Sequence, residues 1–529
     1  MHAARFSASA ALTSASFASA VVLFAWLWSD YREYWLDDAF ITFRYSRHLA
    51  EGLGPVYNLG ERVEGYTSFL WMLLAGIPLH FVGESAALAS IKAFSLIASF
   101  WILYRVWSFP GPDGPTRRWW VLILASQPVF IINCGDAMET PLFMVLMVEC
   151  ALALQREPSG RGGTGVGLLT ALMILTRPES LPLLIAIPLL VGFAHRHDRE
   201  RRGDVLAWFR AFFLAALLPV LCHEAWRWSY YGQPFPNTYY AKATGSQLAR
   251  LGEGVEDISR FLSSNPWRAP VAIWIAMGLG VLVSAKRMVR AQPEVVRWLG
   301  ALWLMVVFRL CFDLWSGSDT MGRHRFLAPL LVPLVILADE GARFLWRGAG
   351  RGVVVALLVI SLYYNVTGHW NHEWSAGHYR RGLENAHIAL GRWLHEQYPA
   401  ESVLAIGDAG AVPFFSRLTT IDMWGLNDAA IAHLPGEYGR KAAMAGDVLG
   451  RDPDLIVLWN RVSFLAEDTP DETIGDAHRV GRVHGGKEID RSIAEQQSFG
   501  RDYRFIREFV FRAHSPEIPG YYLDVFERR

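Results

Sequence analysis

The sequence contains little cysteine: only 4 of its 529 residues are Cys. Cys134, Cys150, Cys222 and Cys311 lie far apart, in or beside apolar runs, without the paired spacing of a disulfide framework or a zinc site. Small buried apolar side chains are therefore the better interpretation. No G-x-G-x-x-G motif follows the GDAG segment at 407–410, so a dinucleotide site is not predicted either.

Charge is also scarce. Asp, Glu, Lys and Arg make up 19% of the chain and the formal net charge is zero, so nothing in the bulk electrostatics indicates a nucleic-acid partner. Hydrophobic residues reach 52%, with 22 Trp and 30 Phe, which together exceed the norm for soluble proteins. This composition predicts a polytopic membrane protein. Residues 1–28 have no convincing cleavage site before Asp30, so they are predicted to be a retained first helix.

About 11 apolar runs approach the ~20 residues that a membrane span takes when their flanks are included. They lie at about 8–28, 86–107, 119–134, 139–155, 164–176, 180–194, 205–223, 269–284, 298–314, 327–342 and 353–367. The basic loops at 114–120, 195–203, 284–297 and 343–352 are predicted to face the cytoplasm. The alternate connections then face outward.

One further apolar stretch, 66–82, is short and interrupted by Gly76 and Pro78. If Asp37 lies outside and Arg117 inside, an odd number of crossings must separate them. The stretch 66–82 therefore cannot cross in addition to 86–107. It is predicted to be a juxtamembrane or half-inserted helix.

The character of the chain changes after about residue 368. Residues 369–529 contain no membrane-length apolar run and alternate an amphipathic helix, roughly 376–397, with short apolar strands. The strand segments are SVLAIGD, LTTIDM, DLIVLW, YRFIREFVF and YYLDVFE. The predicted architecture is a polytopic α-helical membrane domain over 1–368, followed by an extracytoplasmic soluble α/β domain over 369–529.

Two adjacent carboxylates, Asp37 and Asp38, follow the first apolar segment. Charges close to hydrocarbon are costly, so a membrane protein that keeps them there usually uses them. One Asp would suffice to cap the helix that begins here, and the presence of two favours function. Such a pair suits a transferase with a lipid-linked sugar donor. One carboxylate would be the base for the acceptor hydroxyl, and the other its orienting or metal-binding partner.

Further polar side chains occupy the same first loop and four other outward connections. Each has a plainer interpretation: Asp136 and Glu139 could cap a helix, and Arg177 and Glu179 could form an ordinary ion pair. The aromatics at 224–242 suit sugar rings or an interfacial belt. The candidate substrate-binding residues are Arg44, Glu64, Tyr66, Glu139, Arg177, Glu179, Asn237, Tyr240, Lys242, Asp319, His324 and Arg325.

No cofactor is required by the sequence, and the identity of any metal is unknown. A divalent cation such as magnesium or calcium is possible. Its carboxylate ligands would come from Asp37, Asp38 or Asp319, only if the fold brings these together.

Six motifs occur in order between about residues 35 and 428: DDAFITFRYSRHLAEGLGPVYNLGERVEGYTSFLW, GDAMETPLF, LTRPES, YYGQPFPNTYYAK, GSDTMGRHRFLAP and GDAGAVPFFSRLTTIDMWGLND. Together they resemble the terminal β-1,2-arabinofuranosyltransferases of the bacterial cell envelope, within the C-type glycosyltransferase superfamily. The resemblance implies a multi-pass enzyme of the bacterial plasma membrane with its active site outside. Its partners would be a polyprenyl-phosphate arabinofuranose donor, a glycan or glycoprotein acceptor and the bilayer. The resemblance maps the catalytic base to Asp37 or Asp38.

Three alternatives stay open at this point. The donor could carry another sugar, such as aminoarabinose or mannose. The protein could be a non-catalytic envelope scaffold, as similar proteins named for flagellar motor control suggest. A transporter is disfavoured, because the charges gather at one surface and no internal repeat is visible.

Overall fold

The computed structural model describes residues 2–111, 119–242, 246–263, 277–284, 286, 292–317, 324–347, 350–441, 444–460, 488–514 and 519–529. The chain forms two compact units, each assembled from three segments. The first unit comprises Met1–Arg32, Ser90–Ala225 and Ser246–Glu373, and the second comprises Glu33–Ala89, Trp226–Gly245 and Trp374–Arg529. The domain boundary expected at residue 368 lies inside a long helix, Arg351–Gly382, and stays a prediction.

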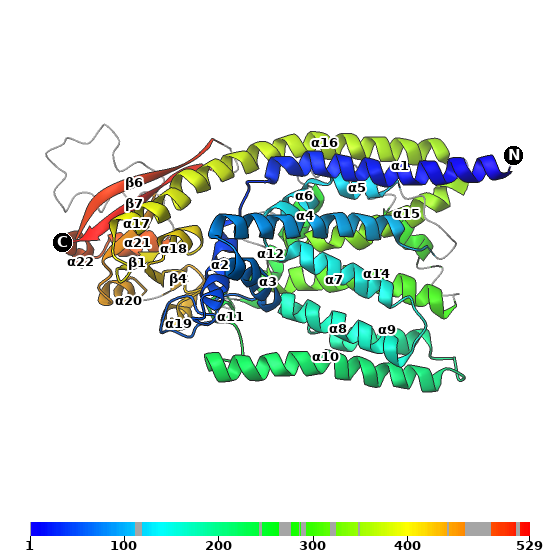
Figure 1. Cartoon of the computed structure of the whole chain (residues 1–529), viewed down its shortest axis with the longest axis horizontal. Coiled ribbons are helices and arrows are strands. Elements are labelled where there is room, and N and C mark those ends of the chain that lie inside the picture. Colours follow the sequence, from blue (N-terminus) through cyan, green and yellow to red (C-terminus); the bar gives the residue numbers. More distant parts are fainter. Residues whose placement is uncertain are drawn as a thin grey trace. The chain divides into compact units, whose positions relative to one another are not determined.

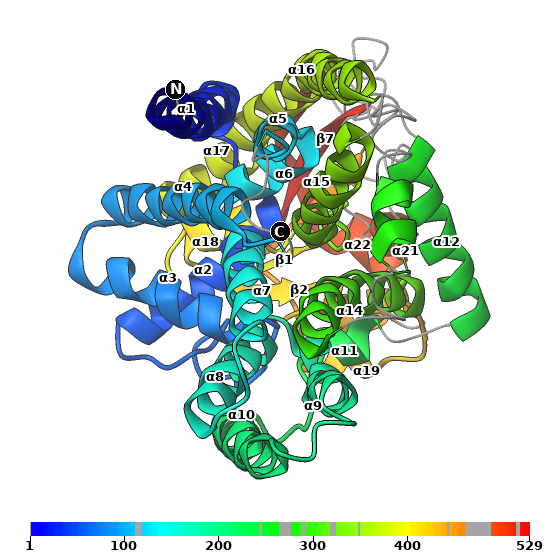
Figure 2. The same cartoon turned by 90° about the vertical axis from the view of Figure 1, so that its right-hand side faces the viewer.

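The first unit is helical over its described residues (Figure 1). Its elements, some of which continue into the second unit, are α1 (His2–Trp28), η1 (Ser29–Tyr31), α4 (Glu84–Ser108), α5 (Val121–Ser126), α6 (Pro128–Gly135), α7 (Thr140–Ala153), α8 (Gly160–Thr176), η2 (Pro178–Ser180), α9 (Leu183–Ala194), α10 (Arg202–Tyr231), α12 (Gln247–Ser263), α14 (Pro293–Ser316), η3 (Ala328–Leu330), α15 (Leu331–Arg347) and α16 (Arg351–Gly382). Helix α7 packs beside α8, and α9 beside α14 (Figure 2). Apolar runs become helices because a helix satisfies its backbone groups internally, as hydrocarbon requires.

Four of the described helices are long and apolar enough to cross a membrane: α4, α10, α14 and the Arg351–Trp370 part of α16. Helices α6 and α7, bent by 117°, would make a fifth span if they act as one. Helix α10 exposes Leu214, Leu218 and Leu221, a surface that suits lipid better than water. The polytopic helical character is confirmed, whereas the count of about 11 spans stays a prediction.

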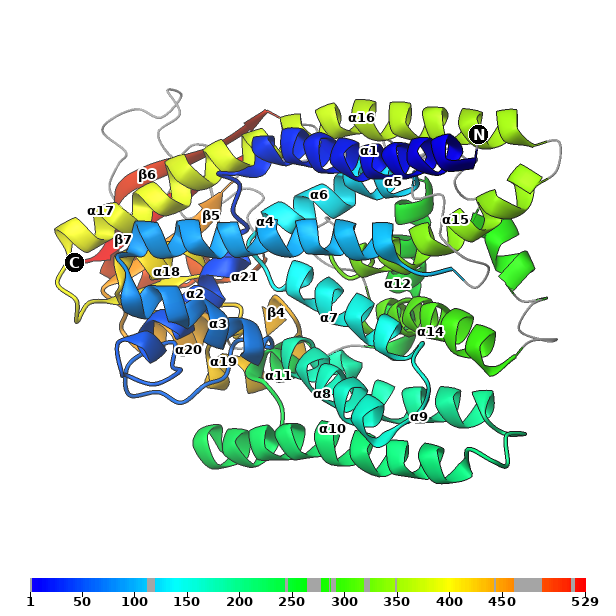
Figure 3. The ribbon, with the colours of Figure 1, turned by 45° about the vertical axis from the view of Figure 1, so that its right-hand side comes forward.

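The short apolar stretch at 66–82 forms α3 (Phe69–Phe81) in the second unit. Its 13 residues extend about 20 Å at ~1.5 Å per residue, less than the ~30 Å of a bilayer core. Helix α3 lies against α2 (Asp37–Ala50) (Figure 3). A Cβ added at Gly76 would approach the carbonyl oxygen of Ser46 to 3.3 Å, so glycine permits this packing. Its location at a membrane surface stays a prediction.

The remaining helical elements of the second unit surround a mixed sheet. They are α11 (Asn237–Lys242), the π-helical segment η4 (Leu383–Ile388), α17 (Ala389–Gln397), α18 (Ala411–Ser416), α19 (Ala429–His433), α20 (Met444–Gly450), α21 (Glu488–Ala494) and α22 (Gln497–Asp502). The sheet has the strand order β2-β1-β5-β7-β6. Its strands are β1 (Val403–Ile406), β2 (Thr419–Asp422), β5 (Leu455–Asn460), β6 (Tyr503–His514) and β7 (Pro519–Arg528), and a small hairpin joins β3 (Gly436–Glu437) to β4 (Arg440–Lys441).

Strands β2, β1 and β5 run parallel, and β7 runs antiparallel to both β5 and β6. Strands β6 and β7 are the longest of the sheet and pair with each other at its edge (Figure 1). Ala405 pairs with Ile421 and Ile456, and all three are buried in the core between the sheet and its helices. All five strand segments expected from the sequence are strands, so the mixed α/β character of the C-terminal region is confirmed.

Candidate active site

Asp37 and Asp38 occupy the first turn of α2, where negative charge is favoured by the helix dipole. The N-cap is Leu36, an extended residue that makes no side-chain cap hydrogen bond. The Oδ1 atom of Asp37 accepts a 2.8 Å hydrogen bond from the backbone N–H of Ala411, the first residue of α18. The carboxylate of Asp37 is therefore held by the turn that follows β1.

This turn approaches Asp37 closely because residue 410 is glycine. A Cβ at Gly410 would lie 2.2 Å from the carbonyl oxygen of Asp37 and 2.4 Å from its Oδ2 atom. Real Cβ atoms essentially never approach other atoms that closely, so a side chain would force the turn or the carboxylate to move. The backbone N–H of Asp37 also donates to the hydroxyl of Tyr379 on α16, at 3.3 Å.

Burial raises the pKa of Asp37 to about 6. Beside it, a protonated His387 and the N–H of Ala411 lower that pKa, whereas the negative charges of Asp408 and Asp38 raise it. A carboxylate with a pKa near 6 is mostly ionised in neutral solution, yet it is a stronger base than an ordinary aspartate. Both properties suit a general base.

Two residues that the sequence did not indicate as site residues accompany Asp37. Asp408 lies in the turn after β1, and its Oδ2 atom is 3.0 Å from Nε2 of His387. His387 is carried by the π-helical segment Leu383–Ile388 between α16 and α17, a geometry found frequently at functional sites. The hydroxyl of Tyr521 on β7 lies 3.3 Å from the same Nε2 atom.

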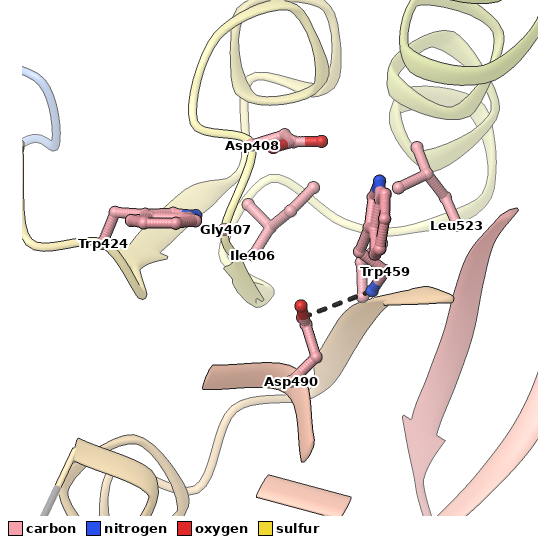
Figure 4. Close-up of a pocket in the computed structure, with 8 residues that line it drawn as sticks. Ile406, Gly407, Asp408, Trp424, Trp459, Asp490 and Leu523 are labelled. Atoms are coloured by element: carbon pink, nitrogen blue, oxygen red, sulfur yellow. Dashed lines mark hydrogen bonds between the residues drawn. The ribbon is translucent and has the colours of Figure 1, made fainter. Parts of the chain in front are cut away.

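A pocket opens at the carboxyl ends of the parallel strands, the edge at which open α/β sheets bind ligands. Its lining comprises Ile406, Gly407, Asp408, Trp424, Val457, Trp459, Asp490 and Leu523. Trp424 and Trp459 lie on either side of the hollow, and Asp408 and Asp490 lie at two of its margins (Figure 4). Asp490 accepts a 3.2 Å hydrogen bond from the backbone N–H of Trp459. The hollow itself holds only about 10 Å³, roughly the room for one water molecule, so its aromatic and carboxylate groups mark a surface and not a formed sugar pocket.

The loop that carries Trp424 is held by the buried Asp422, at the end of β2. Its carboxylate accepts hydrogen bonds from the backbone N–H groups of Trp424 and Asn427, at 2.9 and 2.8 Å. The side-chain amide of Asn427 donates a third, at 2.9 Å. Burial raises the pKa of Asp422 to about 7. The loop is thus fixed by one carboxylate beneath it.

Four of the candidate substrate-binding residues in the second unit bind the protein itself. The buried guanidinium of Arg44 donates to the carbonyl oxygens of Tyr57, Pro413 and Leu418 and to Asn58. Glu64 pairs with Arg227 at 2.8 Å, Tyr66 shares a 3.1 Å hydrogen bond with Tyr231, and Asn237 donates to the carbonyl oxygens of Gly425 and Leu426. The polar groups of these four residues are thus engaged within the chain. Their direct contact with substrate stays a prediction.

The other two candidates in this unit are more accessible. Lys242 is exposed, and its Nζ atom lies 5.4 Å from the ring centroid of Tyr438. Burial raises the pKa of Tyr438, and Asp422, Asp38 and Asp408 add to the rise, so its ring lies near the carboxylates. The ring of Tyr240 stacks on His433 at 4.8 Å. Of the two predicted cations in the unit that contains Asp37, Arg44 is buried and Lys242 is the exposed one.

The other candidate substrate-binding residues belong to the first unit. Nη2 of Arg177 lies 2.9 Å from Glu139, and Nη1 lies 4.0 Å from Glu179. Glu179 also binds Arg309 at 3.0 Å, which extends the ion pairs into α14. Sequence reasoning missed Arg309, although a charge inside an apolar helix is the available signal. Arg325 interacts electrostatically with Glu139.

The structure describes one of two further candidates in the segment 319–325, His324, but not the other, Asp319. Nδ1 of His324 lies 3.1 Å from Asp257 on α12, so this histidine is paired. Asp319 lies outside the described residues. Within the ranges given above, no group of three or more His, Cys, Asp or Glu side chains is arranged to hold a metal ion. A divalent cation therefore stays a prediction from the sequence.

Residues 70–312 match the model of glycosyltransferase family 87, and residues 373–523 match a domain of unknown function, DUF8728. A terminal β-(1→2)-arabinofuranosyltransferase from Corynebacterium glutamicum is 44% identical over 69% of this chain and 55% of its own length. A protein of the same name from Mycobacterium tuberculosis is 26% identical over 65% of this chain and 58% of its own length. The chain thus spans little more than half the length of these relatives.

The crystal structure of ArnT from Cupriavidus metallidurans bound to undecaprenyl phosphate shares the fold, with a TM-score of 0.52 and 13% identity. That likeness covers 84% of this chain and 92% of ArnT. Together with the two sequence relatives, it confirms the resemblance to membrane glycosyltransferases that the motifs indicated.

Proposed function

We propose that this protein is a membrane glycosyltransferase that transfers arabinofuranose from a polyprenyl-phosphate donor to a glycan, with Asp37 as the general base. The observation that carries this proposal is the half-buried Asp37 carboxylate, bound by the Ala411 N–H and flanked by Asp408. The names of the two sequence relatives support the sugar and the reaction. The undecaprenyl phosphate bound to ArnT supports the class of lipid donor.

In the proposed step, Asp37 takes the proton from an acceptor hydroxyl. The acceptor oxygen forms a bond to the anomeric carbon of the donor sugar, while the bond from that carbon to the phosphate oxygen breaks. The lipid phosphate leaves with the electron pair of that bond. Because Oδ1 of Asp37 is bound to Ala411, Oδ2 is the atom proposed to take the proton.

Cations near the leaving group would stabilise the charge that develops on the phosphate. The sequence predicts that Lys242, Arg177, His324 and Arg325 contact the substrate. Lys242 is exposed in the unit that contains Asp37, so we assign it first to an anionic ligand. The aromatic faces of Trp424 and Trp459 are proposed to contact a sugar ring of the acceptor.

We further propose about 11 membrane crossings in the bacterial plasma membrane, with the active site and the C-terminal domain outside the cytoplasm. The basic loops support this orientation, and α3 is proposed to lie at the membrane surface. Accessibility labelling of cysteines introduced at 83–85 tests the topology. Labelling from the cytoplasmic side would contradict it.

The function is tested in proteoliposomes supplied with defined polyprenyl-phosphate sugars and an arabinan acceptor. We expect Asp37→Asn to lower transfer by about 10²-fold or more, the usual contribution of general base catalysis. Asp38→Asn shows whether the neighbouring carboxylate contributes. Glu51→Gln, an exposed change at the end of the same helix, serves as the matched control.

Each result distinguishes one interpretation. Wild-type turnover in both aspartate variants would exclude the carboxylate mechanism. Transfer from a mannose or aminoarabinose donor, but not from arabinofuranose, would identify another lipid-linked sugar. No transfer from any donor by a folded wild-type protein would favour the envelope scaffold.

A further inference from the structure

His387 is a buried histidine that the proposed step does not use, although it is next to the residues that take part. It is 2% exposed, and its Nε2 atom lies 3.0 Å from the carboxylate of Asp408. Asp408 is a lining residue of the tryptophan pocket and one of the charges that acts on Asp37. The role of His387 therefore bears directly on the proposed base.

The backbone around His387 has an uncommon geometry. The segment Leu383–Ile388 is a π-helical segment between two α-helices, α16 and α17. Such segments are rare in proteins, and those that do occur often lie at functional sites. The helix packs tightly against β6 here, because a Cβ at Gly382 would lie 2.5 Å from the ring of Phe511.

The imidazole is fixed on several sides. Its ring meets Phe511 edge-on, with centroids 5.7 Å apart, and Tyr521 edge-on at 5.9 Å. Tyr521 is itself stacked on Phe511 at 4.4 Å and packed against Trp459 at 4.9 Å. With the Tyr521 hydroxyl 3.3 Å from Nε2, His387 has little freedom to leave Asp408.

Asp408 lies in the short turn after β1, and Ala411 is the first residue of the helix that follows this turn. We propose that His387 is a positioning residue for Asp37: by binding Asp408, it fixes the turn that presents the Ala411 N–H to the Asp37 carboxylate. This inference rests on the proposed function, in which Asp37 is the base. It assigns to the C-terminal α/β domain a part in setting the base, in addition to the proposed binding of acceptor.

Charge gives His387 a second effect on the same base. The groups that act on Asp37 or face it are Asp38 on α2, Asp408 on the turn, His387 on η4, Tyr57 on the loop after α2, Tyr379 on α16 and Tyr521 on β7. A protonated His387 offsets the negative charges of Asp38 and Asp408. Without His387, the pKa of Asp37 is expected to rise above about 6.

Two substitutions separate position from packing. His387→Phe keeps a ring in place but removes the hydrogen bond to Asp408. His387→Gln places an amide N–H near the former Nε2 position and restores a donor. His395→Phe on α17 is the matched control, because His395 is exposed and its Nδ1 atom lies 3.3 Å from the carbonyl oxygen of Ser416, away from Asp408.

We expect His387→Phe to lower kcat by about 10- to 100-fold, as misplacing a catalytic group by ~1 Å does. The KM values for donor and acceptor should change by less than about twofold, and the acid limb of the kcat profile should move to higher pH. His387→Gln should recover most of kcat. A purely structural histidine would lower the folded fraction without moving the pH profile of the folded enzyme.

The outcomes are distinguishable from failure of the proposed function. If Asp37→Asn is inactive while His387→Phe keeps the wild-type kcat and pH profile, the inference is overturned and the function stands. If Asp37→Asn is fully active, the proposed base itself is wrong. Should His387→Phe not fold, Asp408→Ala removes the same hydrogen bond from its other end, and a wild-type kcat in that variant overturns the inference.

Discussion

The carboxylate of Asp37 accepts a 2.8 Å hydrogen bond from the backbone N–H of Ala411, although 374 residues separate the two along the chain. The candidate base therefore belongs to a structure made by both ends of the sequence. One unit contains the first polar loop, the segment around Asn237 and the C-terminal sheet. Residues of the C-terminal part of the chain are accordingly among the immediate neighbours of Asp37.

The first prediction concerns the pH dependence of transfer. A general base works in its ionised form, and the pKa of Asp37 is raised to about 6, so kcat/KM should rise as the pH increases through 6 and level off above 7. The negative charge of Asp408 contributes to that raised pKa. Asp408→Asn should therefore move the acid limb to lower pH, as measured by initial rates in proteoliposomes between pH 4.5 and about 8.

The control for this experiment is Glu495→Gln, an exposed change in the same domain that should leave the acid limb in place. A limb that stays unmoved in Asp408→Asn, or that moves to higher pH, would contradict the electrostatic coupling of the two aspartates.

The second prediction concerns the close approach of the turn to α2. Gly410→Ala adds a Cβ 2.2 Å from the carbonyl oxygen of Asp37, so the Ala411 N–H should be displaced from the carboxylate. We expect a loss of transfer on the order of 10- to 100-fold, with the folded protein still recovered. Gly446→Ala on α20, where no atom lies within 4 Å of the added Cβ, should be active and no less stable.

Much of this arrangement followed from the sequence. The five apolar segments after residue 400 alternate with polar turns, which is enough to predict strands, and each is a strand. The pair Asp37–Asp38 was identified because charges beside apolar segments are costly and are usually kept for a function. The hydrophobic pattern of a segment, and the cost of burying its charges, can both be read from that segment alone.

The partners of these residues could not be predicted in the same way. Asp408 follows a strand in the segment GDAG, but nothing local indicates that His387 binds it, because the pairing depends on a π-helical segment and on packing against β7. The sequence predicted that Arg44 binds substrate, yet its guanidinium donates hydrogen bonds to backbone carbonyl oxygens of the chain. The sequence shows that a charge needs a partner and does not show which partner it finds.

The third prediction concerns the tryptophan pocket. Trp459→Ala and Trp424→Ala each remove an aromatic wall, so the KM for the acceptor glycan should rise by about 10-fold, the effect of ~1.4 kcal/mol of lost binding. The KM for the lipid donor should stay the same. Trp393→Phe, on α17 against Phe509, is the matched aromatic change away from the pocket. Equal rises of both KM values in the pocket variants would argue against an acceptor site.

The last prediction concerns stability and rests on Asp524, a buried residue of β7. Burial raises the pKa of Asp524 to about 8, and Glu508 raises it further, whereas the hydrogen bond from Asn460 lowers it. In the unfolded chain, where the carboxyl group is in water, the ordinary aspartate pKa of 3.8 applies. Between these two values the folded state binds the proton more tightly than the unfolded state does.

The sign of the pH effect follows from this difference. The stabilisation by the bound proton is complete below about pH 4 and is lost as the pH rises towards 8. Asp524→Asn removes the titration, so the thermal midpoint of the purified protein should fall less between pH 5 and 8 than it does in the wild type. Asp422 has a pKa raised to about 7, so part of the decline should persist in the variant. Parallel declines in wild type and Asp524→Asn, measured beside the exposed control Glu495→Gln, would show that Asp524 is ionised in the folded protein.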